Sequence, residues 1–149
     1  MGKLNILLCL GWPMKVREFR PEDYKGCLRV WKESRLYVGL MDGREDVMRL
    51  HSMNGDLFLV SEEDGEVVGT AIATFSGNLA LIYHLAVLKG YRKRGIGSSL
   101  LEEEFRRLKA KGARFVLVFN HDSHRDARPF YRRTGFRGIG NFKGFYRKL

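Results

Sequence analysis

The sequence predicts a mixed α+β domain built around one central sheet. Three apolar segments, at 57–60, 67–75 and 79–87, follow one another through short turns, which predicts an antiparallel meander. Helical patterns lie on either side of this meander, at 22–34 and 95–111. The 149 residues are 44% hydrophobic, which is enough to bury a core at this size. We therefore expect one folded domain without repeats or linkers.

The N-terminal part of the chain is predicted to lie outside this domain. The apolar run 4–10 is far too short to span a bilayer, and no signal-peptide exit follows it. A first strand is expected at 15–19, where apolar residues alternate with charges. We therefore expect an N-terminal extension over 1–13, a single domain over 14–149, and a cytoplasmic protein with reduced thiols. The alternative is that the extension forms a strand or docking segment that covers an apolar patch.

The first half of the domain is expected to contain two helices. Pro21 and the acidic residues after it are typical of a helix start, and apolar residues then recur at helical spacing over 22–34. Asp42 and Gly43 form a turn signal, and the residues after them predict a short helix within 36–52.

The second half completes the sheet. The almost continuous apolar run 79–87 predicts a strand buried on both faces, and 115–119 predicts a second buried strand. Between them, 95–111 carries an apolar stripe at helical spacing and ends at a glycine. A short helix is expected over 126–133, and a closing hairpin over the glycine-spaced, aromatic segment 136–149.

Charge is distributed unevenly along the chain, whose formal net charge is +10. Residues 14–66 contain 9 basic and 12 acidic residues, whereas 89–149 contain 17 basic and 5 acidic residues. An anionic partner is therefore expected on the second half. Aromatic residues are not interleaved with the basic ones, and no zinc-finger or helix-turn-helix spacing is present, so nucleic acid is not the favoured partner. Two cysteines alone cannot form a four-ligand zinc site, and no metal is expected.

The most informative segment is the basic turn between strand 79–87 and helix 95–111. It carries two glycines, Gly95 and Gly97, where the helix opens. A helix N-terminus offers unpaired amides and partial positive charge, and glycine lets an anion approach the backbone closely. This arrangement suits a pyrophosphate. The dinucleotide fingerprint is excluded, since it requires a glycine at Leu100.

Two motifs in this half of the chain resemble those of the GNAT superfamily of N-acetyltransferases. The first is Leu85-Ala86-Val87 followed by Arg92-Lys93-Arg94-Gly95-Ile96-Gly97, and the second runs from Ala127 through Tyr131 to Gly135-Phe136. The resemblance covers Met14 to Leu149. It implies the GNAT-type fold, with a mixed, mostly antiparallel sheet of about six or seven strands and about four helices.

The resemblance also implies a site for acetyl-coenzyme A (acetyl-CoA). The co-substrate would lie where strands 79–87 and 115–119 splay apart, with its pantetheine arm pairing along the first strand like an added strand. Its pyrophosphate would bind the amides of residues 92–97. Tyr131 would protonate the departing thiolate as the catalytic acid. The expected cofactor-binding residues are Leu85, Ala86, Val87, Arg92, Lys93, Arg94, Gly95, Ile96, Gly97 and His124.

The sequence departs from the family pattern at two places. His124 stands where many members have an asparagine seven residues before the tyrosine, and it can donate one hydrogen bond in place of the amide. The glutamate that serves some members as general base is absent, since Leu81 and Phe119 occupy the corresponding positions. The base therefore stays open among Tyr83, His84, His121, Asp122 and water.

The resemblance implies an acetyl-CoA-dependent N-acetyltransferase that acts on a primary amine by direct attack in a ternary complex. The acceptor would be lined by 22–52, where Asp42, Glu45 and Asp46 favour a cationic amine such as a peptide amine, a polyamine or an aminoglycoside-like amine. Two alternatives stay open: a non-catalytic basic module that binds nucleic acid or another polyanion, and a CoA-binding sensor. A homodimer through the aromatic C-terminus also stays open, and no membrane partner is expected.

Overall fold

The computed structural model describes residues 14–36, 39–120, 124, 127–140 and 145–149. The chain divides into two compact units, 1–118 and 119–149, and each is described by itself. The first unit holds the sheet and three helices, and the second holds one short helix. The expected extension 1–13 lies outside the described residues, so its boundary and the single domain 14–149 stay predictions.

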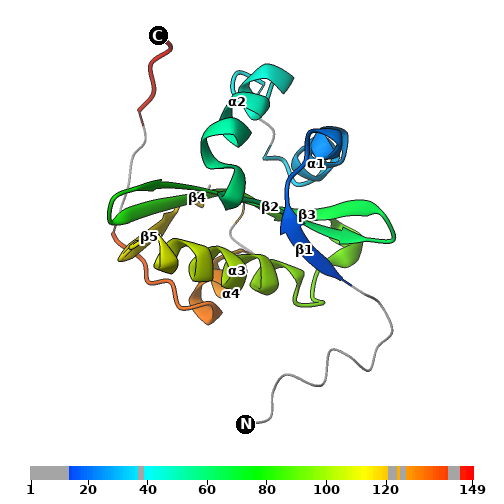
Figure 1. The fold of residues 1–149 in the computed structure, drawn as a ribbon. Helices are drawn as coiled ribbons and strands as arrows, with labels where there is room; N and C mark the ends of the chain where they lie inside the picture. The colour runs from blue at the N-terminus through cyan, green and yellow to red at the C-terminus, as the bar shows by residue number, and fades with distance from the viewer. Residues whose placement is uncertain (1–13, 37–38, 121–123, 125–126, 141–144) are drawn as a thin grey trace. The chain divides into compact units, whose positions relative to one another are not determined.

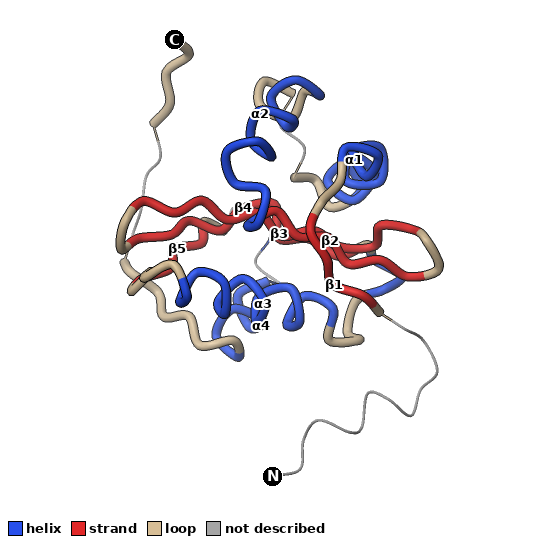
Figure 2. The backbone as a smooth tube through the Cα atoms, viewed as in Figure 1, coloured by secondary structure: helices blue, strands red, loops and turns tan. Residues whose placement is uncertain are grey.

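The sheet of the first unit contains five strands in the order of the sequence. Neighbouring strands are antiparallel, except for the last pair, which is parallel. Figure 2 shows the strands forming one layer with helices on both sides. The predicted mixed α+β class and the predicted meander are thereby confirmed. The strands are β1 (Lys15–Glu18), β2 (Phe58–Glu63), β3 (Glu66–Ser76), β4 (Leu79–Val87) and β5 (Phe115–Val118).

The helices cover the two faces of this sheet. Helices α1 (Tyr24–Glu33) and α2 (Arg44–Asn54) lie on one face, and α3 (Ile96–Ala110) lies on the other (Figure 1). Trp31 of α1 and Leu100 of α3 are fully buried, which places apolar core on both sides of the sheet. These three helices confirm the helical patterns of the sequence. The second unit contains the short helix α4 (Arg128–Arg133), also as expected.

Two predictions about the strands are wrong. Among the described residues the sheet has five strands rather than six or seven, and the described parts of 136–149 contain no strand. In that segment Phe145 and Tyr146 are 94% and 90% exposed, so their aromatic rings bury no surface that would stabilise a hairpin. A two-stranded hairpin without such packing is marginal in water.

The second error concerns burial. Only Ala80, Ile82 and Ala86 are buried in β4, and no residue of β5 is buried. Phe115 of β5 is 59% exposed. The reason is that β5 is the edge strand of the described sheet and covers only four residues of β4.

One buried carboxyl group on α3 stands out against this apolar core. Glu104 is fully buried, and neither of its carboxyl oxygens has a hydrogen-bond partner among the described residues. Burial raises the pKa of Glu104 to about 9, because the charged form loses its hydration there. The side chain is therefore protonated at neutral pH.

The raised pKa of Glu104 predicts that the free energy of unfolding falls as the pH rises. The unfolded chain releases the proton near the ordinary pKa of 4.5, whereas the folded chain keeps it to about 9, so the folded state loses stability between these values. Glu104→Gln cannot titrate. We expect its free energy of unfolding, relative to wild type, to rise by roughly 4 kcal/mol between pH 5 and pH 8 in urea unfolding. The exposed Glu102→Gln is the control, and equal pH slopes for all three proteins would contradict the prediction.

Candidate functional site

Strand β4 is paired along its whole length on one side only. Its register with β3 runs from Leu79 to Val87, whereas its register with β5 ends where Ile82 pairs with Val118. In the described residues no strand pairs with the β5 side of β4 from Tyr83 to Val87. We call this stretch the free edge. A row of unpaired backbone groups on a sheet edge can pair with an extended ligand.

The backbone of Val87 points toward the free edge. The amide of Leu88 donates to the carbonyl of Val68 at 2.9 Å, so the neighbouring residue faces away from β3. In agreement, Nε of Arg92 donates to the carbonyl oxygen of Val87 at 2.9 Å. Leu85 is half-buried, whereas Ala86 is buried and pairs with Thr70 of β3.

A β-bulge interrupts β4 at the start of the free edge. Tyr83 pairs with Ile72 and Ala86 pairs with Thr70, so β4 carries one residue more than β3 across this interval. His84 within the bulge has a φ of 49°, which is uncommon for a residue with a side chain. Its backbone therefore needs support from the surrounding structure.

A buried hydroxyl group supplies part of that support. Oγ1 of Thr70 donates to the carbonyl oxygen of His84 at 2.6 Å, and Nε1 of Trp31 donates to the same hydroxyl at 3.0 Å. Thr70 and Trp31 are both fully buried. Helix α1, strand β3 and the bulge are thus joined through one side chain.

The imidazole of His84 is paired with a buried carboxylate. Its Nε2 lies 2.7 Å from Oδ1 of Asp42, and the two side chains are 9% and 5% exposed. The imidazole also packs against Trp31, with the ring centroids 4.6 Å apart. Asp42 was expected to favour a cationic acceptor, together with Glu45 and Asp46. In the structure it faces His84, and only the other two acids are exposed.

The structure separates the candidates for the general base. Burial, with the charge of Asp42 as a smaller cause, raises the pKa of Tyr83 to about 12. That phenol keeps its proton near neutral pH and cannot accept another. His121 and Asp122 lie outside the described residues. Of the remaining candidates, His84 lies within the described residues, where its Nε2 is paired with Asp42.

The turn that precedes α3 leaves backbone amides without carbonyl partners among the described residues. Lys93 and Gly95 have φ values of 64° and 83°, and the first helical bond runs from the amide of Ser99 to the carbonyl of Gly95. Within the described part of the chain, no backbone carbonyl accepts a hydrogen bond from the amides of 93–98. An added Cβ at Gly95 would meet no atom within 4 Å, so backbone conformation rather than space favours glycine there.

The side chains of this turn divide into exposed cations and one core residue. Arg92, Lys93 and Arg94 are exposed, whereas Ile96 is buried. Arg94 donates to the carbonyl of Gly90 at 3.0 Å and lies over the Tyr91 ring at 5.1 Å. Gly97 lies in the first turn of α3.

Two of the expected site residues belong to the second unit. Tyr131 of α4 packs edge-on against Phe130 and Phe136, each at 5.6 Å between ring centroids. Burial raises the pKa of Tyr131, which keeps its phenol protonated. His124 is half-buried, and its carbonyl accepts a hydrogen bond from Asn120 at 3.0 Å.

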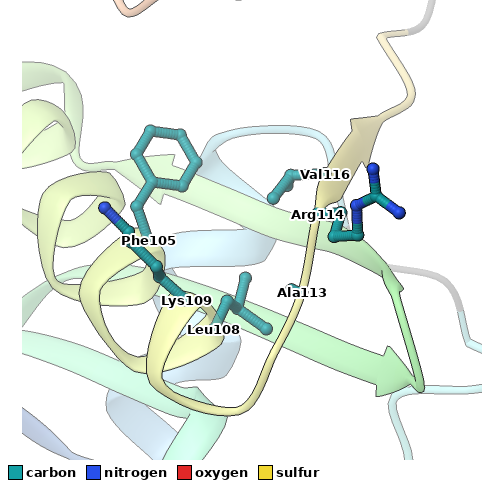
Figure 3. A pocket seen from close by; sticks show the side chains of 6 residues that line it. All are labelled: Phe105, Leu108, Lys109, Ala113, Arg114 and Val116. Atoms are coloured by element: carbon teal, nitrogen blue, oxygen red, sulfur yellow. The ribbon is translucent and has the colours of Figure 1, made fainter.

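The first unit also has an open, mostly apolar pocket of about 310 Å³ between α3 and β5 (Figure 3). None of the expected site residues lines it. Its lining residues are Phe105, Leu108, Lys109, Ala113, Arg114 and Val116. The described residues contain no cluster of side chains suited to a metal ion, and none of their helices is long and apolar enough to cross a membrane.

Comparison with known proteins identifies the family of the chain. The model of the acetyltransferase (GNAT) domain matches residues 54–138, which is more than half of the chain. The chain belongs to the GNAT family. As a GNAT protein it is an N-acetyltransferase, and its family resemblance is confirmed. An acetyltransferase from Photorhabdus laumondii is 33% identical over 111 residues, which cover 74% of this chain and 78% of that protein.

Solved GNAT-fold structures have the same architecture. Ard1 from Thermoplasma volcanium has a TM-score of 0.77 at 24% identity, over 85% of this chain and 84% of that one. The PaiA N-acetyltransferase from Thermoplasma acidophilum, solved in complex with coenzyme A, has a TM-score of 0.77 at 21% identity. That match covers 88% of this chain and 93% of that one. At these identities the likeness supports the fold alone.

The hydrogen bonds of the Thr70 hydroxyl at the bulge predict the effect of one substitution in this GNAT protein. Thr70→Val keeps the side-chain shape but leaves the indole N–H of Trp31 and the carbonyl of His84 without their shared partner. We expect a loss of about 2–3 kcal/mol in the free energy of unfolding, measured in urea. Thr74→Val, at a half-buried position of the same strand, is the control. An equal effect of both substitutions would show that the hydroxyl of Thr70 does not support the bulge.

Proposed function

We propose that this protein transfers the acetyl group of acetyl-CoA to a primary amine, by direct attack within a ternary complex. The observation that carries the proposal is the free edge of β4, which runs directly into the turn whose amides have no carbonyl partners among the described residues. The coenzyme A complex of the PaiA relative supports acetyl-CoA as co-substrate. Membership of the GNAT family supports acetyl transfer as the reaction.

The two parts of this surface fit different parts of acetyl-CoA. The pantetheine arm carries amides that suit pairing with the backbone of Leu85 and Val87 at the free edge. The pyrophosphate suits the amides of 92–97, because the start of α3 adds partial positive charge there. The exposed side chains of Arg92, Lys93 and Arg94 supply further positive charge for the phosphates.

The chemistry needs a polarised carbonyl and a proton for the leaving group. Backbone amides near Val87 would stabilise the negative charge that develops on the thioester oxygen. The phenol of Tyr131, protonated across the neutral range, would donate its proton to the departing thiolate. Binding both substrates side by side removes much of the entropic cost of the attack.

The acceptor is proposed to be cationic. Glu45 and Asp46 are exposed in the first turn of α2, on the face of the sheet opposite to α3. Two carboxylates there attract a protonated amine, such as a peptide amine or a polyamine. They also complement the dipole of α2, so their charge has a structural role as well.

The phosphate site is tested at Gly97. Gly97→Val places a branched side chain beside the amides proposed to bind pyrophosphate, and we expect acetyl-CoA affinity to fall about tenfold or more in calorimetry of the full chain. Ala110→Val at the exposed end of the same helix is the matched control. Unchanged affinity would refute the placement. A wild-type protein that binds a DNA duplex in a salt-sensitive way, but not acetyl-CoA, would refute the function and favour the polyanion-binding alternative.

The acid role is tested at Tyr131. Tyr131→Phe removes the donor hydroxyl and keeps the ring, so turnover is expected to fall about 10²-fold at neutral pH while acetyl-CoA affinity is retained. Turnover is followed by release of free thiol, and affinity by calorimetry. Tyr146→Phe, at a residue that is 90% exposed, is the control. Equal turnover of both variants would remove the acid role, and binding without turnover of any amine by the wild type would favour the CoA-binding sensor.

A further inference from the structure

We propose that His84, oriented by Asp42, is the base that takes a proton from the acceptor amine. The inference rests on the proposed function. It concerns the removal of a proton from the acceptor amine, because this chain has no carboxylate at the positions where some family members carry their base. It is carried by the position, burial and pairing of these two side chains.

The pair lies where the two substrates are proposed to meet. His84 belongs to the bulge at the start of the free edge, one residue before Leu85. Its imidazole contacts Trp31 of α1 and Asp42 just before α2, so it lies on the face of the sheet that these helices cover. That is the face with the exposed acids Glu45 and Asp46. The imidazole therefore lies on the face of the sheet proposed for the acceptor, next to the free edge.

The carboxylate determines which imidazole nitrogen is basic. An ionised Asp42 can only accept hydrogen bonds, so Nε2 of His84, 2.7 Å away, must carry the proton. The lone pair of the neutral imidazole then lies on Nδ1, for which no hydrogen bond is formed within the described residues. A carboxylate in this position also stabilises the imidazolium that forms after proton uptake. The side chain is 9% exposed, so a small part of it remains accessible.

The backbone conformation of His84 supports a functional rather than a packing role. A bulge turns a side chain away from the ordinary strand alternation, and such strain persists only where the surroundings stabilise it. Here the hydroxyl of Thr70 donates to the carbonyl and itself accepts from the indole of Trp31, while Asp42 holds the ring. Asp42 is held in turn by Tyr24, whose hydroxyl donates to its carbonyl oxygen at 2.9 Å. The imidazole is thus fixed from three elements.

Few other titratable groups of the described segments face this imidazole. Asp42 comes from the segment before α2, and Tyr83 from β4, with its ring 5.4 Å from that of His84. Tyr24 of α1 donates a hydrogen bond to the backbone of Asp42, and the guanidinium of Arg44 lies over the Tyr24 ring. Tyr83 keeps its proton because burial raises its pKa to about 12. Of the described groups in this cluster, His84 is the one with a ring nitrogen, Nδ1, that makes no hydrogen bond within the described residues.

The proposed step balances as follows. The acceptor ammonium gives one proton to Nδ1 of His84, and the lone pair of the neutral amine forms a bond to the thioester carbonyl carbon. The carbon–sulfur bond then breaks, and the thiolate gains a proton from Tyr131. The second proton of the amine nitrogen passes through water to the Tyr131 phenolate and restores the phenol. The imidazolium returns its proton to water. The net products are the acetylated amine, free coenzyme A and one proton.

The test compares His84→Gln and Asp42→Asn with the wild type in the full chain. Glutamine keeps a donor toward Asp42 but has no basic nitrogen, and Asp42→Asn can donate to Nε2 and so move the imidazole proton to Nδ1. We expect kcat/KM for a primary amine to fall about 10²-fold to 10³-fold at pH 7 in both variants. The loss should shrink below about tenfold near pH 10, where much of the amine is already neutral. His51→Gln on α2 is the matched control, and His84→Asn provides a second variant because asparagine tolerates a positive φ.

A second readout does not depend on activity. Nitrogen NMR of the protein without substrates should show His84 protonated at Nε2 and unprotonated at Nδ1 at pH 8, with this pattern lost in Asp42→Asn. A proton on Nδ1 in the wild type would overturn the inference. An equal loss of kcat/KM at every pH, or no loss, would also overturn it, since a structural role does not depend on the charge of the amine. A wild type that neither binds acetyl-CoA nor acetylates any amine would instead refute the proposed function, and the inference with it.

Discussion

The arrangement of the proposed site depends on how far β4 is paired on each edge. Its pairing with β3 continues to Val87, but its pairing with β5 stops at Ile82. A fully paired strand would have no backbone groups left for a ligand, and a fully unpaired one would not be held straight. Because β3 holds one edge, the other can present ordered donors and acceptors. The turn after Val87 then adds the amides at the start of α3, so one continuous stretch of backbone can serve both ends of acetyl-CoA.

The β-bulge around His84 determines the backbone geometry at the start of the free edge. A buried hydroxyl at Thr70 connects the indole of Trp31 to the carbonyl of His84, and these contacts tie α1 and β3 to the strand that carries the free edge. Buried polar groups of this kind are costly when left unpaired, so the network favours one geometry of the bulge over its alternatives. The same geometry directs the imidazole of His84 toward Asp42. Structural support of the bulge and the orientation of the proposed base therefore come from the same contacts.

Features with a local cause could be predicted from the sequence. The meander, the helix from Ile96 and the glycine turn before it follow from periodicity and from turn residues within a few positions of each other. The predictions that failed depend on distant partners. Burial of Phe115 requires a covering strand, and strands in 136–149 require a surface on which Phe145 and Tyr146 can pack. The pairing of His84 with Asp42 spans 42 positions along the chain, and no local pattern links an acid after one helix to a bulge in a later strand.

The charge asymmetry of the sequence acquires a spatial meaning in the fold. The acidic residues Glu45 and Asp46 belong to α2, whereas the cations Arg92, Lys93 and Arg94 precede α3, and these two helices cover opposite faces of the sheet (Figure 1). An anionic co-substrate and a cationic acceptor would each be attracted to a different face, and opposite charges kept apart do not neutralise each other. The two substrates could then meet only where the sheet opens, at the unpaired part of β4. The uneven charge along the chain is thus consistent with the proposed site for two substrates at the free edge.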